Sequence, residues 1–191
     1  LSTHYDFSVR NSEGGVVQFL YGDDGLDPAE LEGNALPVEY HRTFLHAAAK
    51  TADIPSRYLL PYEVMDMVDE ALSEDRFQRL CTAKYIEQVR DFCQDKIAKH
   101  MARTREVYGM YPALTRDGDF DADTDLSLGA DEAQRAIVEN KARVSEATIR
   151  EFLYLCWEKY MRAKIEPGSA VGAVGAQSIG CLLYTSPSPR D

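Results

Sequence analysis

The sequence is poor in cysteine, and its few cysteines are not arranged as metal ligands. The 191 residues include four cysteines: Cys81, Cys93, Cys156 and Cys181. They form no Cys-x-x-Cys pair, and the histidines form no pair at a ligand spacing. Structural zinc sites need such clustered ligands. We therefore expect no zinc site in this chain, and we expect reduced thiols, as in a cytosolic or nuclear compartment.

Long apolar runs are also missing. No run reaches the length that spans a bilayer, and no charged segment followed by an apolar one marks a leader. We therefore expect no membrane contact. The sequence begins at Leu1 rather than at a methionine, so we expect it to be a piece of a longer protein.

Basic residues are few compared with acidic ones. The 21 Lys and Arg residues stand against 32 Asp and Glu residues, which gives a formal net charge of -11. A protein that binds nucleic acid by itself normally has an excess of Lys and Arg, because these side chains contact phosphates. The composition therefore predicts a chain that faces mostly protein and solvent.

The residues that are present predict a mainly α fold with a short N-terminal β-hairpin, in the α+β class. Hydrophobic residues make up 45% of the chain, which is enough for one or two modest cores. Residues 5–10 and 16–21 alternate like strands around turn residues 11–15. Three acids follow, Asp23, Asp24 and Asp27, and their spacing matches no set of metal ligands. Pro28 indicates that Asp27 caps a helix.

Several later segments have the periodicity of amphipathic helices. A helix over about residues 39–50 would place Phe44 and Leu45 on its apolar side, and Pro61 suits the first position of another helix. A long helix, with room for a break, is predicted from about residue 73 to 108. We interpret its second face as solvated and ion-paired rather than RNA-binding, because acids interleave with its basic residues: Arg90, Lys96, Lys99, Arg103 and Arg105.

Ser145 marks the start of the clearest predicted helix. Its hydroxyl can cap the first turn, and Glu146 complements the positive helix end. Pro167 is expected to stop the helix. One wide apolar face is predicted from residues at helical spacing: Ile149, Phe152, Leu153, Cys156, Trp157 and Tyr160.

Two segments carry a resemblance to a known family. Residues 166–180 have the sequence Glu-Pro-Gly-Ser-Ala-Val-Gly-Ala-Val-Gly-Ala-Gln-Ser-Ile-Gly. This segment resembles the lead-in to the trigger loop of the largest subunit of multisubunit RNA polymerases, and its Pro-Gly-Ser-Ala-Val-Gly-Ala form is most similar to RNA polymerase III. Residues 16–28, Val-Val-Gln-Phe-Leu-Tyr-Gly-Asp-Asp-Gly-Leu-Asp-Pro, are similar to the stretch that follows the bridge helix in the same subunit.

The resemblance implies a fragment of a DNA-directed RNA polymerase, a nucleotidyltransferase of the nucleus that acts in transcription. The family uses Mg²⁺ for two-metal phosphoryl transfer, with ligands outside this fragment, and Zn²⁺ can lie elsewhere in the subunit. Other polymerase subunits would be the partners, and DNA template and RNA would be bound through the whole complex. The fragment alone is expected to be inactive, with no catalytic residue, no metal ligand and no bound cofactor. Its expected site residues are the lead-in to the trigger loop: Gln177, Ser178, Ile179 and Gly180.

The resemblance also suggests how the chain is divided. Residues 1–28 would form a cleft hairpin, residues 29–144 a foot-like helical insertion, and residues 145–180 a cleft helix with the trigger-loop lead-in. After Gly180 the family continues Glu-Pro-Gly-Thr-Gln-Met-Thr, whereas this chain continues Cys-Leu-Leu-Tyr-Thr-Ser-Pro-Ser-Pro-Arg-Asp. We expect residues 181–191 to be a non-native tail, because a nucleotide sequence that encodes them resembles a sequencing adaptor.

An acidic run over residues 117–132 has two metal-binding alternatives. Its alternating acids resemble a calcium loop, but Leu126 stands where that loop needs glycine. They also resemble the magnesium motif of polymerase largest subunits, but Ala122 replaces a glycine and the family's motif lies upstream of the bridge helix. We interpret the run as a flexible loop.

A second hypothesis is an acidic helical interaction module without an enzymatic parent. It accounts for the net charge and for the amphipathic helices. It does not account for two family motifs in the expected order.

Overall fold

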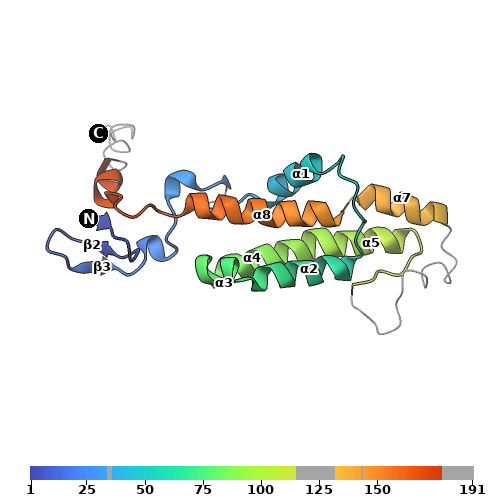
Figure 1. The fold of residues 1–191 in the computed structure, drawn as a ribbon, viewed down its shortest axis with the longest axis horizontal. Helices are drawn as coiled ribbons and strands as arrows, with labels where there is room; N and C mark the ends of the chain where they lie inside the picture. The colour runs from blue at the N-terminus through green and yellow to red at the C-terminus, as the bar shows by residue number, and fades with distance from the viewer. Residues whose placement is uncertain (34–35, 115–131, 143, 178–191) are drawn as a thin grey trace, which may run out of the picture. The chain divides into compact units, whose positions relative to one another are not determined.

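The computed structural model describes residues 1–33, 36–114, 132–142 and 144–177 (Figure 1). The chain divides into two compact units. We call Leu1–Pro37 with Arg162–Asp191 the terminal unit, and Val38–Met161 the helical unit. The α+β class predicted from the sequence is confirmed.

The terminal unit contains a three-stranded antiparallel sheet in the order β1-β2-β3. Its strands are β1 (Ser2–Thr3), β2 (Val9–Arg10) and β3 (Val16–Gln18). The predicted hairpin is confirmed as β2–β3, although both strands are shorter than the alternating runs. The Asn11 side-chain oxygen closes the turn by accepting hydrogen bonds from the backbone N–H groups of Glu13 and Gly15, at 3.1 and 2.7 Å.

Two 3₁₀ segments follow the sheet, η1 (Tyr21–Asp23) and η2 (Pro28–Glu30). The predicted cap at Asp27 is confirmed, since its carboxylate accepts from the N–H of Ala29 at 2.9 Å. This turn pairs with the distant end of the chain. Asp27 donates its N–H to the carbonyl of Ala163 at 2.8 Å, and Ile165 donates to the carbonyl of Gly25 at 2.9 Å.

The described part of the helical unit is built almost wholly of helices (Figure 1). Within the described ranges these are α1 (Tyr40–Lys50), α2 (Pro61–Ser73), α3 (Asp75–Leu80), α4 (Ala83–Phe92), the π-helical η4 (Cys93–Ala98), α5 (Lys99–Val107), α7 (Glu132–Ala142) and α8 (Glu146–Ala163). Three predicted helix starts are confirmed. Glu39 caps α1 by accepting from Arg42 N–H at 2.6 Å, Pro61 opens α2, and Ser145 Oγ accepts from Thr148 N–H at 3.3 Å.

The long helix predicted over residues 73–108 is interrupted. The backbone is extended at Glu74 and again at Cys81, so α3 is a short separate helix before α4, η4 and α5. The second interruption is held by a tertiary contact, because Thr82 donates its N–H to the hydroxyl of Tyr160 on α8 at 3.1 Å. The break allowed for in the predicted helix over residues 73–108 is therefore confirmed.

Aromatic side chains form the centre of the helical unit. The rings of Tyr85 and Tyr160 lie 4.3 Å apart between centroids, and Phe92 lies 5.7 Å from Phe152. The hydroxyl of Tyr85 donates to the carbonyl of Cys156 at 2.8 Å, so this buried polar group is satisfied. Further core side chains come from α2 to α8: Val64, Val68, Leu72, Phe77, Val89, Cys93, Ile97, Met101 and Ile149.

The apolar side predicted for α1 was wrong by part of a turn. Leu45 is 55% exposed, while Tyr40, Thr43 and Ala47 are buried. Phe44 lies at the edge of the buried face, with its ring 5.7 Å from that of Phe152. A tyrosine ring at the first position can reach the core, and this shifts the buried face away from the aliphatic residue.

The basic face of the long helix is only partly solvated. Lys99 pairs with Asp95 at 2.5 Å, as the interleaved acids predicted, whereas Arg90 pairs at 2.8 Å with Asp69 on α2. Arg105 is different, with 5% of its surface exposed and its Nε donating to the carbonyl of Tyr111 at 2.7 Å. The interpretation of Arg105 as a surface cation was wrong, because the chain after α5 folds back over it.

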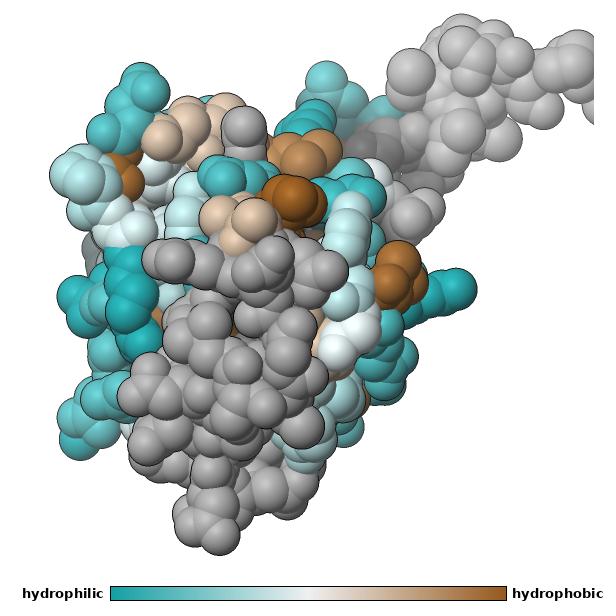
Figure 2. Space-filling view, turned by 90° about the vertical axis from the view of Figure 1, so that its right-hand side faces the viewer, coloured by the Kyte–Doolittle hydropathy of each residue, from teal (hydrophilic) through white to brown (hydrophobic). Residues whose placement is uncertain are grey.

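The three described cysteines, Cys81, Cys93 and Cys156, are free. Burial raises the pKa of the Cys93 thiol to about 12, which keeps it protonated and unreactive. Over the described ranges, no helix combines the length and apolar character needed to cross a bilayer. The face at the α5 and α7 end is mostly hydrophilic, with few hydrophobic side chains among the polar ones (Figure 2).

Candidate functional site

The segment expected to lead into a trigger loop is anchored on strand β1. Thr3 exchanges backbone hydrogen bonds with the turn that opens this segment, donating to Ser169 at 3.0 Å and accepting from Gly168 at 2.8 Å. Its hydroxyl donates to the carbonyl of Glu166 at 2.7 Å and accepts from the N–H of Ser169 at 3.0 Å. One buried threonine therefore holds both sides of the turn.

The first helical turn of the segment is held as closely. Gly172 donates its N–H to the carbonyl of Leu1 at 3.2 Å. A Cβ atom at position 172 would lie 3.0 Å from the Cβ and 3.2 Å from the N of Leu1, so a larger residue would require Leu1 to shift by a few tenths of an ångström. Gly168 has a φ of +88°, which any residue with a side chain would adopt at a cost.

A small apolar cluster lies beneath this anchor. Val9, Ile165 and Val171 are buried together, and Tyr21 packs against them. Tyr21 belongs to the family-like segment 16–28, and Val171 belongs to the family-like segment 166–180. The two sequence motifs therefore meet in one cluster.

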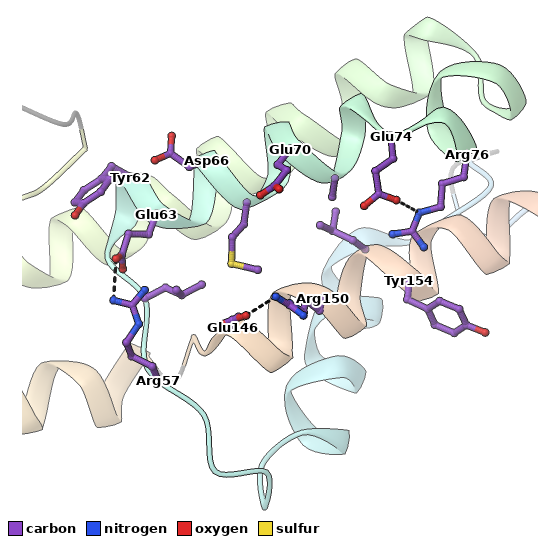
Figure 3. A pocket seen from close by; sticks show the side chains of 14 residues that line it. Arg57, Tyr62, Glu63, Asp66, Glu70, Glu74, Arg76, Glu146, Arg150 and Tyr154 are labelled. Carbon is purple, nitrogen blue, oxygen red and sulfur yellow. Dashed lines mark hydrogen bonds and ion pairs between the residues drawn. The ribbon is translucent and has the colours of Figure 1, made fainter.

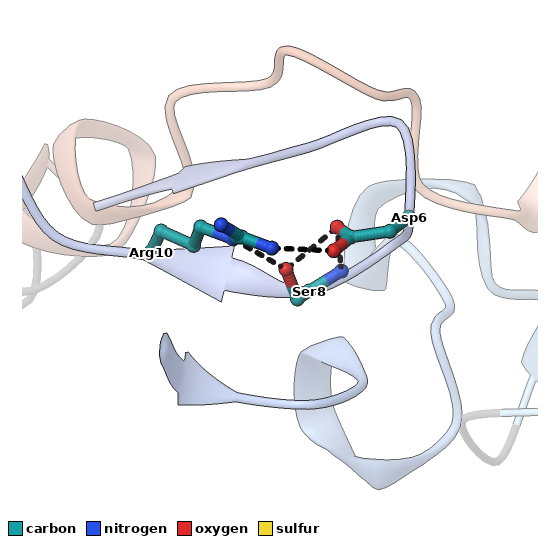
Figure 4. Close-up of polar contacts among 3 residues, drawn as sticks. All are labelled: Asp6, Ser8 and Arg10. Carbon is teal, nitrogen blue, oxygen red and sulfur yellow. Dashed lines mark hydrogen bonds and ion pairs between the residues drawn. The ribbon is translucent and has the colours of Figure 1, made fainter. Parts of the chain in front are cut away.

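A polar turn between β1 and β2 stiffens the sheet beside the anchor (Figure 4). Asp6 Oδ1 accepts from the Ser8 hydroxyl at 2.6 Å and from Ser8 N–H at 3.1 Å, while Arg10 donates to Asp6 Oδ2 at 2.6 Å. Hydrogen bonds from Ser8 and then Arg10 hold the pKa of Asp6 well below its usual range. Phe7, at the tip, has a positive φ of 63°, and Lys164 Nζ lies 5.0 Å from the centre of its ring.

Beyond its anchored start, the segment faces solvent. Residues 171–177 are helical, and residues 173–177 are exposed. Of the four expected lead-in residues, Gln177 is the exposed last residue of this stretch, while Ser178, Ile179 and Gly180 lie outside the described residues. The arrangement can fix the position and direction of the chain that follows Gln177.

The described residues do not fit a magnesium site. Among them, no group of three or more His, Cys, Asp or Glu side chains is placed to hold a metal ion. Two of the acids in segment 16–28 serve the backbone instead: Asp24 Oδ1 accepts from Leu26 N–H at 3.0 Å, and Asp27 caps η2. The acidic run over residues 117–132 lies almost wholly outside the described residues.

Sequence reasoning missed the most connected residue of the site. Thr3 lies on a two-residue strand, too short for a period, and its partners are more than 160 positions away. No local signal marks such a residue. The only pointer was that segments at both ends of the chain resembled the same family.

The two family-like segments meet in the terminal unit, and the helical unit lies between them in the sequence. The chain belongs to the family RNA polymerase Rpb1, domain 5, whose model matches residues 1–181. The resemblance inferred from the two motifs is confirmed.

Curated relatives place the chain closer to one polymerase class. It is 47% identical over 181 residues to the DNA-directed RNA polymerase III subunit rpc1 of Schizosaccharomyces pombe. It is 36% identical to the corresponding subunit of Saccharomyces cerevisiae and 31% identical to that of Homo sapiens. Each match covers 94% of this chain, while the chain spans 13%, 14% and 12% of these relatives.

Proposed function

We propose that the chain is a segment of the catalytic largest subunit of DNA-directed RNA polymerase III. In the whole enzyme, that subunit would synthesise small RNAs from a DNA template with ribonucleoside triphosphates. The observation that carries this proposal is the anchoring of the family motif 166–180 on the opposite end of the chain: Thr3 holds its opening turn, and Tyr21 of the motif 16–28 packs into the same cluster as Val171.

The anchored segment would act as the fixed base of the trigger loop. A loop that closes over a matched nucleotide aligns the reacting groups and excludes water, provided that its hinge is rigidly placed. Three backbone hydrogen bonds and three hydrogen bonds of the Thr3 hydroxyl hold that hinge to Leu1 and Thr3. The expected lead-in residues, Gln177 to Gly180, would then be the first that move.

The division of the chain stays part of the proposal. Residues 1–28 and 145–180 would belong to the cleft, and residues 29–144 would form the foot-like insertion. Residues 181–191 would be a non-native tail, and the end of the family match at residue 181 supports this.

Partners and cofactors follow from the same proposal. The chain would contact other polymerase subunits in the nucleus, and DNA and RNA would be reached through the whole complex. The catalytic Mg²⁺ would be held by residues outside this chain, as the family resemblance implies.

The test replaces Thr3 by valine in the full-length subunit. Thr3→Val keeps the shape of the side chain but removes the three hydrogen bonds of the hydroxyl, which should loosen the hinge. Because a displacement of about 1 Å can cost on the order of a hundredfold in rate, we expect nucleotide addition to slow by roughly tenfold or more. The measurement is single-nucleotide addition on a preassembled transcription bubble.

Thr51→Val is the matched control. Thr51 is also a buried threonine, with its hydroxyl donating to the Ala47 carbonyl at 2.8 Å, but it lies in the helical unit. We expect that variant to add nucleotides within about twofold of the wild-type rate. Equal rates for Thr3→Val and wild type, in complexes that assemble and bind template, would remove the anchor from the mechanism.

A further inference from the structure

A charged groove lies in the helical unit between α2 and the first half of α8 (Figure 3). Its volume is about 680 Å³. Along α2 its lining runs from Tyr62 to Glu74, a distance of about 18 Å at 1.5 Å per residue. That length accommodates about three turns of a second helix.

Each arginine of the groove is matched by a carboxylate. Arg57 pairs with Glu63 at 2.9 Å and Arg76 with Glu74 at 2.7 Å, at the two ends of the α2 lining. Across from them on α8, Arg150 pairs with Glu146 at 2.6 Å. Figure 3 shows these three pairs around the groove. The arginines are therefore already neutralised.

Two acids of the groove are left over. Asp66 and Glu70 are exposed and lie four residues apart on α2, on the face that lines the groove. In the part of the chain that the structure describes, neither carboxylate has an ion-pair or hydrogen-bond partner. Like charges at this spacing repel each other, so a cation placed between them would relieve that repulsion.

Apolar side chains also line the groove. Leu59 and Leu153 are buried, and Met67 is half-buried. Methionine adapts to different apolar partners because its side chain is unbranched and flexible. The groove thus offers apolar contact together with surplus negative charge on α2.

We propose that this groove docks a basic amphipathic helix of a separate protein chain. The charge excess complements Lys or Arg and repels nucleic acid. The helical unit has its own aromatic core and does not need the groove covered in order to fold. Polar grooves on self-sufficient units are typical of partners that associate reversibly, whereas obligate interfaces are more apolar.

The binding test uses the full chain and a designed probe. The probe is a labelled helical peptide of about 14 residues, with two Arg one turn apart and Leu on the same face. We expect saturable binding by fluorescence anisotropy. The double variant Asp66→Asn with Glu70→Gln should weaken binding on the order of tenfold, because two charge contacts are lost.

The control removes the same charge elsewhere. Asp91→Asn with Glu106→Gln changes two exposed acids on α4 and α5, outside the groove, and should leave affinity within about twofold. Glu70→Arg should bind the Arg probe least and should gain affinity for the same peptide with Glu in place of Arg.

Three outcomes would overturn the proposal: no binding of the Arg probe, equal weakening by both double variants, or no reversal of preference in Glu70→Arg. Self-association that depends on Glu70, measured by sedimentation, would assign the groove to a second copy instead. Binding of single-stranded RNA that competes with the peptide would do the same for nucleic acid.

Discussion

The two units of the chain bury their aromatic residues very differently. In the helical unit, Phe77, Phe152 and Tyr160 are fully buried. In the terminal unit, Tyr5 is 91% exposed and Phe19 is 88% exposed, and the buried cluster consists of three aliphatic residues. The helical unit has a core of its own, whereas the terminal unit is held mainly by hydrogen bonds between its two distant segments.

This difference in aromatic burial indicates that the two units are held together in different ways. The exposed rings of Tyr5 and Phe19 add little to the folding of the terminal unit, because they bury almost no surface. Precise backbone pairing, as at Thr3 and Gly172, places a segment without enclosing it. The terminal unit therefore depends on pairing between distant segments, while the helical unit depends on a packed aromatic core.

The largest effect is expected from truncating one phenylalanine in each unit, which tests whether only the helical unit has an aromatic core. Phe152→Ala should lower the free energy of unfolding of the chain by about 3–5 kcal/mol, because it leaves a cavity among Phe44, Phe92 and the rest of the core. Phe19→Ala removes the same atoms from an exposed site and should change it by less than about 0.5 kcal/mol. Denaturant unfolding followed by circular dichroism measures both. Similar losses for the two variants would show that the terminal unit has a core as complete as the other.

A second variant tests whether the terminal unit serves to position the helical segment over residues 171–177. Ala176→Pro would remove a helix N–H donor and clash with the preceding turn, at a cost of roughly 3 kcal/mol in that helix. In the full-length subunit it should slow single-nucleotide addition on the order of a hundredfold while assembly and template binding persist. Ala176→Ser, at the same site without the ring, should stay near the wild-type rate. If the proline variant matched the serine variant, the segment would have no part in catalysis.

How much of each unit could be predicted follows from how local its determinants are. The turn at Asn11, the cap at Ser145 and the face of α8 are set by residues within one or two helical turns, and all were predicted. Strand β1 and the burial of Arg105 were not, because both depend on chain that returns from elsewhere. Arg105 has the sequence context of a surface cation, and only the fold-back to Tyr111 makes it a buried donor.

The candidate site divides in the same way. The expected trigger-loop lead-in came from a family resemblance, and its placement beyond Gln177 stays a prediction. The anchor at Thr3 could not come from periodicity or capping rules, since a two-residue strand has neither. Long-range backbone pairing is the part of this site that sequence patterns do not encode locally.

The smallest effect is expected for the pKa values of two exposed carboxylates, one in each unit. Asp6 accepts from Ser8 and Arg10, whereas in the helical unit the hydrogen bond and charge of Lys99 lower the pKa of Asp95. Both folded pKa values lie below the unfolded value of about 3.9, so each group stabilises the fold fully above that pH. The contribution is lost as pH falls through the folded pKa.

Carboxyl-carbon NMR titration should show Asp6 titrating below Asp95, because Asp6 accepts from more donors. Ser8→Ala should raise the midpoint of Asp6 and leave Asp95 unchanged, and Lys99→Met should do the reverse. An Asp6 midpoint near the unfolded value would mean that the turn beside the anchor is not closed in solution, and the rigidity ascribed to the terminal unit would lose one of its supports.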